Sequence, residues 1–461
     1  MARPRMASFF AYTSLDGENA EAERAYILLH ATDSRWLAAN QTTVEIAEYL
    51  DRGTSIDEAA SRLAAEYGLP VEEAMEHVRY VAEELTEKGF LNRGPFAATP
   101  TAGRSPALAT VYLHLTTRCN LNCPHCYVSC PSTNDLSTPL VFRIIDELKS
   151  SGGESVTLSG GEPLVHPEIR RILEYIGPGL KVQLLSNGTL IDKEWASFLA
   201  HEMDATVQIS IDGSKSKIHD AIRGEGSFEK ALKAVGFLQE SGMGRKLNFA
   251  ATIMQQNLHD LLEIIRLAQI LDVPKVRFLP LRKVGRAREE WNALGAHVGL
   301  DEYEKLFDDL YRLRDSRLPA IEIGRGLSGF LLDMDREETV DDIWCPVGRT
   351  LTLATNGDVF PCVLMMQDEF KLGNAFHSTL SELIRSDTMA RTCQALSERR
   401  KRIAKCAECH WRNLCQAGCM GQALDEKETI WDTDGFCAYR KKAYANAFDG
   451  FLKKFIRDGC A

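Results

Sequence analysis

The residues of this 461-residue chain that are best suited to chemistry are its 13 cysteines. They form two groups with only two to five residues between many neighbours, and residues 131–344 contain none. The N-terminal region lacks an apolar segment followed by a small-residue cleavage site, so export is not predicted. An odd number of closely spaced cysteines does not suit a disulfide framework. The spacing therefore predicts metal ligation in a reducing, cytoplasmic setting.

The first group is Cys119-x3-Cys123-x2-Cys126, directly after a predicted strand. Three thiolates can hold three irons of a [4Fe-4S] cube and leave the fourth iron open. An open iron can chelate S-adenosylmethionine (SAM) and pass one electron to its sulfonium, which gives methionine and a 5'-deoxyadenosyl radical. The motif resembles that of the radical SAM superfamily. A zinc site with Cys130 as fourth ligand is the alternative.

The resemblance also implies where SAM is held, at the ends of the three strands that follow. In the family, backbone and a glutamate at the first of these ends hold the SAM amino group, and glycine permits the close approach. Polar side chains on one strand face contact the ribose and methionyl groups, and an arginine lies near the carboxylate. The implied SAM-binding residues are Gly160, Gly161, Glu162, Asn187, Ser210, Asp212 and Arg223. A helix cap for Asp212 and a surface ion pair for Arg223 are the structural alternatives.

The second group has the pattern Cys345-x11-Gly357-x4-Cys362, then Cys406-x2-Cys409-x5-Cys415-x3-Cys419, then Cys437. It resembles, at seven cysteines and the glycine, the SPASM extension, which carries two auxiliary iron-sulfur clusters. Two structural zinc sites are the alternative. The resemblance assigns four thiolates to the second auxiliary cluster: Cys406, Cys409, Cys415 and Cys437. It assigns three to the first auxiliary cluster: Cys345, Cys362 and Cys419.

The set for the first auxiliary cluster is one thiolate short. We expect an open iron there that a substrate thiolate occupies, with Asp341, Asp342, Cys393 or water as the alternative fourth ligand. Cys393 itself is expected to pack as a small buried hydrophobe. The basic run of residues 399–402 is expected to be a solvated helical face.

Six strand-like runs, each followed by a segment of helical length, predict a parallel α/β sheet, either doubly wound or curled into a partial barrel. The resemblance implies the latter, a partial (β/α)6 TIM barrel with ligands at the carboxyl ends of its strands. The expected strands are 110–115, 155–158, 182–185, 207–211, 247–253 and 275–279. The expected domains are 1–93, a linker 94–109, the barrel 110–320, and the SPASM domain with a C-terminal helix 321–461.

Residues 1–93 predict a winged-helix-like domain, with a hairpin from 25–30 and 35–40 and three helices after it. This region has 9 Lys and Arg against 17 Asp and Glu, a net charge of -8, which argues against a nucleic-acid partner. It resembles the precursor-peptide recognition element of peptide maturases, whose strand edge can receive a leader peptide as an extra strand. A helical cap without a ligand is the alternative.

The three parts together resemble maturases of ribosomally made peptides, above all those that install thioether links (sactipeptides and ranthipeptides). The resemblance implies a precursor peptide and a flavodoxin or ferredoxin reductant as partners. No stretch approaches the about 18 to 20 apolar residues of a membrane span. Carbon-carbon crosslinking and oxidative decarboxylation are the alternatives within the enzyme class. A zinc-stabilised peptide-binding adaptor and a winged-helix regulator are the alternatives outside it.

Overall fold

The computed structural model describes residues 9–13, 25–31, 35–91, 108–128, 134–292, 294, 298–312, 319–323 and 345–457. Cys130, Asp341, Asp342 and Cys460 lie outside these residues. Within them, no helix is long and apolar enough to cross a bilayer.

The N-terminal part is a small antiparallel sheet followed by helices, as the sequence predicts. Side chains cap the first two helices: Asn40 accepts a hydrogen bond from the Thr43 amide, and Ser55 accepts one from the Glu58 amide. Strand β1 was not predicted. The elements are β1 (Phe9–Tyr12), β2 (Ala25–His30), β3 (Trp36–Asn40), α1 (Gln41–Asp51), α2 (Ile56–Tyr67) and α3 (Val71–Glu87), with sheet order β1-β2-β3.

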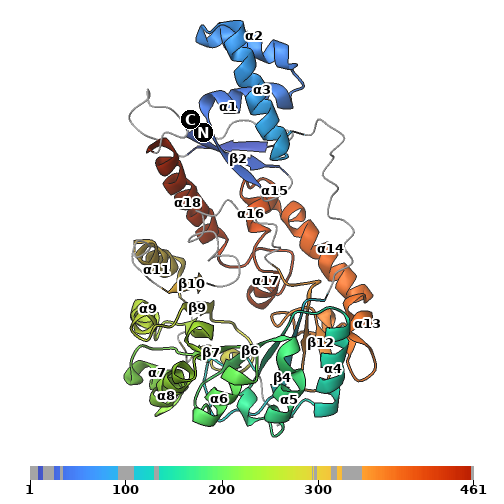
Figure 1. Ribbon diagram of the computed structural model, residues 1–461, viewed down its shortest axis with the longest axis vertical. Coiled ribbons are helices and arrows are strands. Elements are labelled where there is room, and N and C mark those ends of the chain that lie inside the picture. The colour runs from blue at the N-terminus through green and yellow to red at the C-terminus, as the bar shows by residue number, and fades with distance from the viewer. Residues whose placement is uncertain are drawn as a thin grey trace.

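Strand β2 is buried on both faces, and this joins the two ends of the chain. Because side chains alternate across a strand, Tyr26 and Leu28 pack against the core of the small domain. Ala25, Ile27 and Leu29 face the other way and pack with residues of the C-terminal helix α18 (Cys437–Arg457). Figure 1 shows the blue N-terminal sheet beside the end of the red α18 helix.

Phe448 of α18 lies at the centre of this contact. Its ring is fully buried, stacks on Trp411 at 5.3 Å and meets Trp36 edge-on at 5.3 Å. Phe448→Ala is expected to cost about 3 to 5 kcal/mol, because it leaves a cavity in a packed aromatic cluster. Limited proteolysis should then release the N-terminal domain faster. Ile456→Ala, at a more exposed position of α18, is the matched control, and equal proteolysis of both variants would contradict this packing.

The central sheet follows the six-strand prediction closely. All six strands are parallel and stand side by side in chain order, so there is no reversal of order as in a doubly wound sheet. The structure therefore supports the partial barrel. The strands are β4 (Thr110–Thr116), β5 (Ser155–Gly160), β6 (Lys181–Ser186), β7 (Ala205–Ser210), β8 (Leu247–Ile253) and β9 (Lys275–Pro280).

Helices cover the outer face of this sheet (Figure 1), and leucine, isoleucine and valine from both layers form one large core. The helices after the strands are α4 (Thr138–Ser150), α5 (Ile169–Ile176), α6 (Lys193–His201), α7 (Ser216–Arg223), α8 (Ser227–Glu240), α9 (Leu261–Ile270), α10 (Arg286–Glu289) and α11 (Leu300–Arg312).

The sheet continues beyond the six predicted strands. In the described part of the chain, β10 (Ala320–Ile323) extends one edge beside β9, and β11 (Thr350–Leu353) pairs in parallel with β4 at the other. Strands β12 (Asp358–Phe360) and β13 (Gly373–Asn374) complete that edge in antiparallel fashion. The cysteine-rich region therefore shares one continuous sheet with the barrel. Its helices are α13 (Leu380–Ile384), α14 (Asp387–Arg402), α15 (Ala404–Ala407), α16 (Arg412–Cys415), α17 (Met420–Lys427) and α18.

Candidate active site and cluster sites

The loop that carries Cys119, Cys123 and Cys126 follows the end of β4 and is fixed to the end of β5. The Gly161 amide donates to the Thr116 carbonyl at 2.7 Å. A Cβ on Gly161 would lie 2.1 Å from the Arg118 carbonyl oxygen. Close contact between two backbone segments therefore requires this glycine, whereas the sequence had suggested close approach to a ligand.

Gly161→Ala is expected to displace the cysteine loop, because the added methyl meets backbone that cannot move aside. The variant should lose cluster iron at the Cys119 loop, measured as iron per chain after reconstitution. Gly236→Ala in α8 is the control, since a Cβ there meets no atom within 4 Å. Equal iron content in both variants would contradict this interpretation.

Glu162 connects the ends of β5 and β6. Its carboxylate is 1% exposed and accepts hydrogen bonds from the Ser186 hydroxyl at 2.9 Å and the Asn187 amide at 2.8 Å. Burial raises the pKa of Glu162 to about 7, and these donors act against that rise. The Asn187 side chain in turn donates to Asn120, inside the cysteine loop, at 2.9 Å. Two predicted residues thus lie beside the predicted cluster loop.

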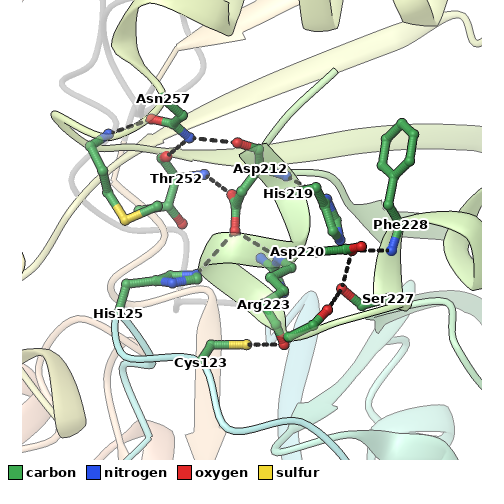
Figure 2. Close-up of polar contacts among 12 residues, drawn as sticks. Cys123, His125, Asp212, His219, Asp220, Arg223, Ser227, Phe228, Thr252 and Asn257 are labelled. Atoms are coloured by element: carbon green, nitrogen blue, oxygen red, sulfur yellow. Dashed lines mark hydrogen bonds and ion pairs between the residues drawn. The ribbon is translucent and has the colours of Figure 1, made fainter. Parts of the chain in front are cut away.

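Asp212 is the centre of a buried polar network after β7 (Figure 2). Its carboxylate accepts from Arg223 Nε at 2.6 Å and from the Thr252 amide at 2.7 Å, and lies 3.2 Å from His125 Nε2. Burial alone would raise the pKa of Asp212, but Arg223 and then His125 hold it well below its usual range. The carboxylate is therefore an anion that positions a cation and an imidazole around the cysteine loop.

Arg223 is not the surface ion pair of the alternative interpretation. Its side chain is 12% exposed, and its backbone carbonyl lies 4.0 Å from Cys123 Sγ. Ser210 is half-buried at the end of β7. The structure brings Asp212 and Arg223 to the cysteine loop, while their contacts with SAM stay predictions.

Sequence reasoning missed His125 and Asn257. His125 lies between two of the cysteines, and its Nδ1 is buried with no hydrogen-bond partner among the described residues. Asn257 is fully buried and donates to the carbonyls of Asp212 and Thr252 at 3.0 and 2.9 Å. The position of His125 inside the cysteine motif was a usable signal. Asn257 gave none, since it lies 45 residues from Asp212.

The four cysteines predicted for the second auxiliary cluster line one pocket that opens to solvent. Cationic and aromatic side chains complete its wall. Burial, and then the neighbouring cysteines, raise the pKa of Cys406 to about 12, so thiolates here need the positive charge of bound iron. Its lining includes Cys406, Cys409, Cys415, Cys437, Arg440 and Lys441.

The three cysteines predicted for the first auxiliary cluster come from separate segments. Cys362 follows β12, Cys419 precedes α17, and Cys345 stands before β11. Burial, and then the charge of the Cys362 thiolate, raise the pKa of Cys419 to about 11. Cys393 packs against the hydrophobic core, in line with the expected role.

In the described residues, no three or more His, Cys, Asp or Glu side chains are arranged to hold a single metal ion. The thiolates of a cube-shaped cluster bind separate irons and stand farther apart than the ligands of one ion. Three thiols on one loop and four around one pocket fit iron-sulfur clusters in number and type.

One expectation about the basic run is wrong. Arg399 is fully buried, and it donates to the carbonyls of Gly418, Ile430 and Asp432 at 2.8, 2.7 and 2.6 Å. Only its neighbours Lys401 and Arg402 are exposed. The turns around the auxiliary cysteines present their carbonyls inward, and a guanidinium with five donors satisfies three of them.

Comparison with known proteins agrees with this geometry. The profile of the radical SAM superfamily matches residues 113–268, that of an iron-sulfur cluster-binding (SPASM) domain matches 345–410, and that of coenzyme PQQ synthesis protein D matches 25–91. Mycofactocin maturase MftC of Mycolicibacterium smegmatis is 30% identical over 324 residues, which cover 66% of this chain and 76% of that protein. The chain belongs to the radical SAM superfamily.

Other relatives of this radical SAM enzyme differ in their named roles. The subtilosin biosynthesis protein AlbA of Bacillus subtilis is 24% identical, over 89% of this chain and 90% of its own. An AdoMet-dependent heme synthase of Oleidesulfovibrio alaskensis is 27% identical, over 74% and 90%. The structure of Streptococcus suis SuiB bound to S-adenosylmethionine superimposes with a TM-score of 0.59 at 18% identity, over 94% and 100%, and supports the fold.

The enzyme therefore uses SAM with a [4Fe-4S] cluster, and its SPASM domain carries auxiliary iron-sulfur clusters. The zinc alternatives lose their support. Which cysteine binds which cluster stays as predicted from the motif.

Proposed function

We propose that this enzyme is a maturase of a ribosomally made precursor peptide and forms a thioether between a cysteine sulfur and a carbon of the peptide. The observation that carries the proposal is the joining of three parts in one chain: the SAM-cluster loop, the auxiliary cysteine sets and a PqqD-like domain. The last part favours a peptide substrate over a porphyrin, because its sheet has an edge that a peptide strand can extend.

The bound groups would supply a 5'-deoxyadenosyl radical that takes a hydrogen atom from the peptide, and an acceptor for the electron released when carbon and sulfur join. The chain's own residues position these groups. Cys119, Cys123 and Cys126 would hold the SAM cluster, and Glu162 with Asn187 would shape the site of the SAM amino group. Arg223, held in place by Asp212, would face the SAM carboxylate. An external flavodoxin or ferredoxin would supply the reducing electron.

The leader peptide would add a strand to the outer edge of β3. Among the described strands, β3 pairs only with β2, so its other edge has no strand partner there. Glu72, Glu73 and Glu83 are exposed on α3 of the same N-terminal part. A negative domain surface would favour a leader with Lys or Arg near its binding segment, and a bound leader raises the local concentration of the core peptide. A leader with these charges neutralised should bind more weakly, and equal affinity would contradict this part.

For the first auxiliary cluster we keep the open iron as the site of the substrate thiolate. Cys393 is half-buried and packs against the same hydrophobic core as Cys345 and Cys362, so it stays the rival fourth ligand, while Asp341 and Asp342 lie outside the described residues. Spectroscopy of the cluster with and without a cysteine-containing peptide would test this, since four protein ligands in both states would overturn it. We also propose a cytoplasmic location, because the clusters need reduced thiols.

The deciding experiment combines the reconstituted enzyme, SAM, dithionite and the product of a short, cysteine-containing reading frame adjacent to its gene. A thioether makes the peptide lighter by two hydrogens and removes one cysteine from alkylation by iodoacetamide. A carbon-carbon link loses the same two hydrogens but leaves every cysteine alkylatable, and oxidative decarboxylation loses carbon dioxide in addition to two hydrogens. Formation of 5'-deoxyadenosine without any change in the peptide would reject the proposed substrate. A peptide without its leader is the control.

A further inference from the structure

A buried ion pair lies between the two sets of auxiliary cysteines. Arg440 of α18 is 4% exposed and Asp434 is 2% exposed. Arg440 Nη1 donates to Asp434 Oδ2 at 3.0 Å, and Nη2 donates to Oδ1. Two hydrogen bonds in parallel fix the plane of the guanidinium, so that its Nε donor has one direction only.

Each partner of this ion pair contacts a different cysteine set. Arg440 Nε donates to the sulfur of Cys415 at 3.2 Å, and Cys415 belongs to the set predicted for the second auxiliary cluster. Asp434 Oδ2 accepts from the backbone amide of Cys419 at 2.7 Å, and Cys419 belongs to the set for the first. One continuous chain of hydrogen bonds therefore joins a ligand of one cluster to a ligand of the other.

The backbone between these two cysteines is shaped around the ion pair. Gly418 has φ +73°, and a Cβ there would lie 2.1 Å from Arg440 Nη2 and 2.6 Å from Asp434 Oδ2. Only glycine allows the guanidinium and the carboxylate to lie against this turn. The three-residue spacing between Cys415 and Cys419 thus encloses a charged pair as well as separating two ligands.

We propose that Arg440 is a positioning residue that sets the reduction potential of the second auxiliary cluster through its hydrogen bond to Cys415. Asp434 connects the same ion pair to the first auxiliary cluster through the Cys419 amide. This rests on the cluster assignment in the proposed function. A hydrogen bond to a ligating sulfur stabilises the more negative, reduced cluster and so raises its potential. The carboxylate of Asp434 acts in the opposite sense on both clusters.

The test is a redox titration followed by electron paramagnetic resonance, in a protein whose Cys119, Cys123 and Cys126 are alanine, so that only auxiliary clusters contribute. Arg440→Lys keeps the positive charge but loses the fixed Nε donor, and the potential of the second cluster should become more negative. The iron-sulfur stretching frequencies in the resonance Raman spectrum should shift with it. The control is Lys441→Gln, which removes a charge from the same pocket wall without removing a hydrogen bond to sulfur that the structure shows.

A potential and Raman spectrum unchanged in Arg440→Lys would overturn the proposal, and so would an equal shift in Lys441→Gln. If Arg440→Lys does not retain its clusters, Asp434→Asn provides the second arm. It keeps an acceptor of similar size and should move the potentials of both clusters upward; no movement would overturn the proposal. If the protein with Cys119, Cys123 and Cys126 replaced by alanine binds much less than about eight irons per chain, the cluster assignment itself is contradicted.

Discussion

Replacing Cys119, Cys123 and Cys126 together by alanine is expected to abolish 5'-deoxyadenosine formation completely. The three thiols lie on one loop tied to the end of β5 through Gly161 and Glu162, and no other part of the described barrel offers a comparable set. Loss of the cluster removes the electron donor that cleaves SAM, so the effect is an absence of turnover rather than a reduced rate. Iron should fall by about four atoms per chain, while the auxiliary clusters stay loaded.

Cys393→Ser is the matched control for this experiment. Cys393 is a half-buried cysteine that packs against the core, and burial raises the pKa of its thiol. We expect unchanged iron content and unchanged SAM cleavage. Loss of iron in Cys393→Ser would make it a ligand and would contradict the open iron at the first auxiliary cluster. Residual 5'-deoxyadenosine in the triple alanine variant would contradict the assignment of the SAM cluster.

The sequence predicted the barrel because its signals are local. Each of the six strands is a short apolar run followed by a segment of helical length, and this strand-helix unit repeats along a parallel sheet. The hairpin and the three N-terminal helices were equally accessible, since Asn40 and Ser55 cap their helices within three residues. The cysteine spacings were informative for the same reason, because neighbouring ligands of a cluster lie on one loop or one turn.

The features that the sequence did not predict depend on contacts between distant segments. Strand β11 pairs with β4 across 240 residues, and nothing in either strand specifies that partner. Gly161 was predicted to lie at the SAM site, but the reason for glycine is the Arg118 carbonyl on another segment. Asn257 holds the Asp212 turn from 45 residues away. Such contacts are fixed by the tertiary packing, so periodicity and motif spacing do not predict them.

Arg399→Met is expected to destabilise the auxiliary-cluster region by about 3 to 5 kcal/mol, although the sequence places Arg399 in a run of basic residues typical of a solvated surface. Methionine fills much of the volume but leaves the buried carbonyls of Gly418, Ile430 and Asp432 without their donor. Because Gly418 lies between Cys415 and Cys419, the turn that carries both ligands should open more often. Faster hydrogen exchange at amides of α14 and α17, with lower iron content, would show this. Lys401→Met, an exposed position on the same helix, should change neither quantity, and equal exchange rates in the two variants would contradict the role of Arg399 as the internal support of these turns.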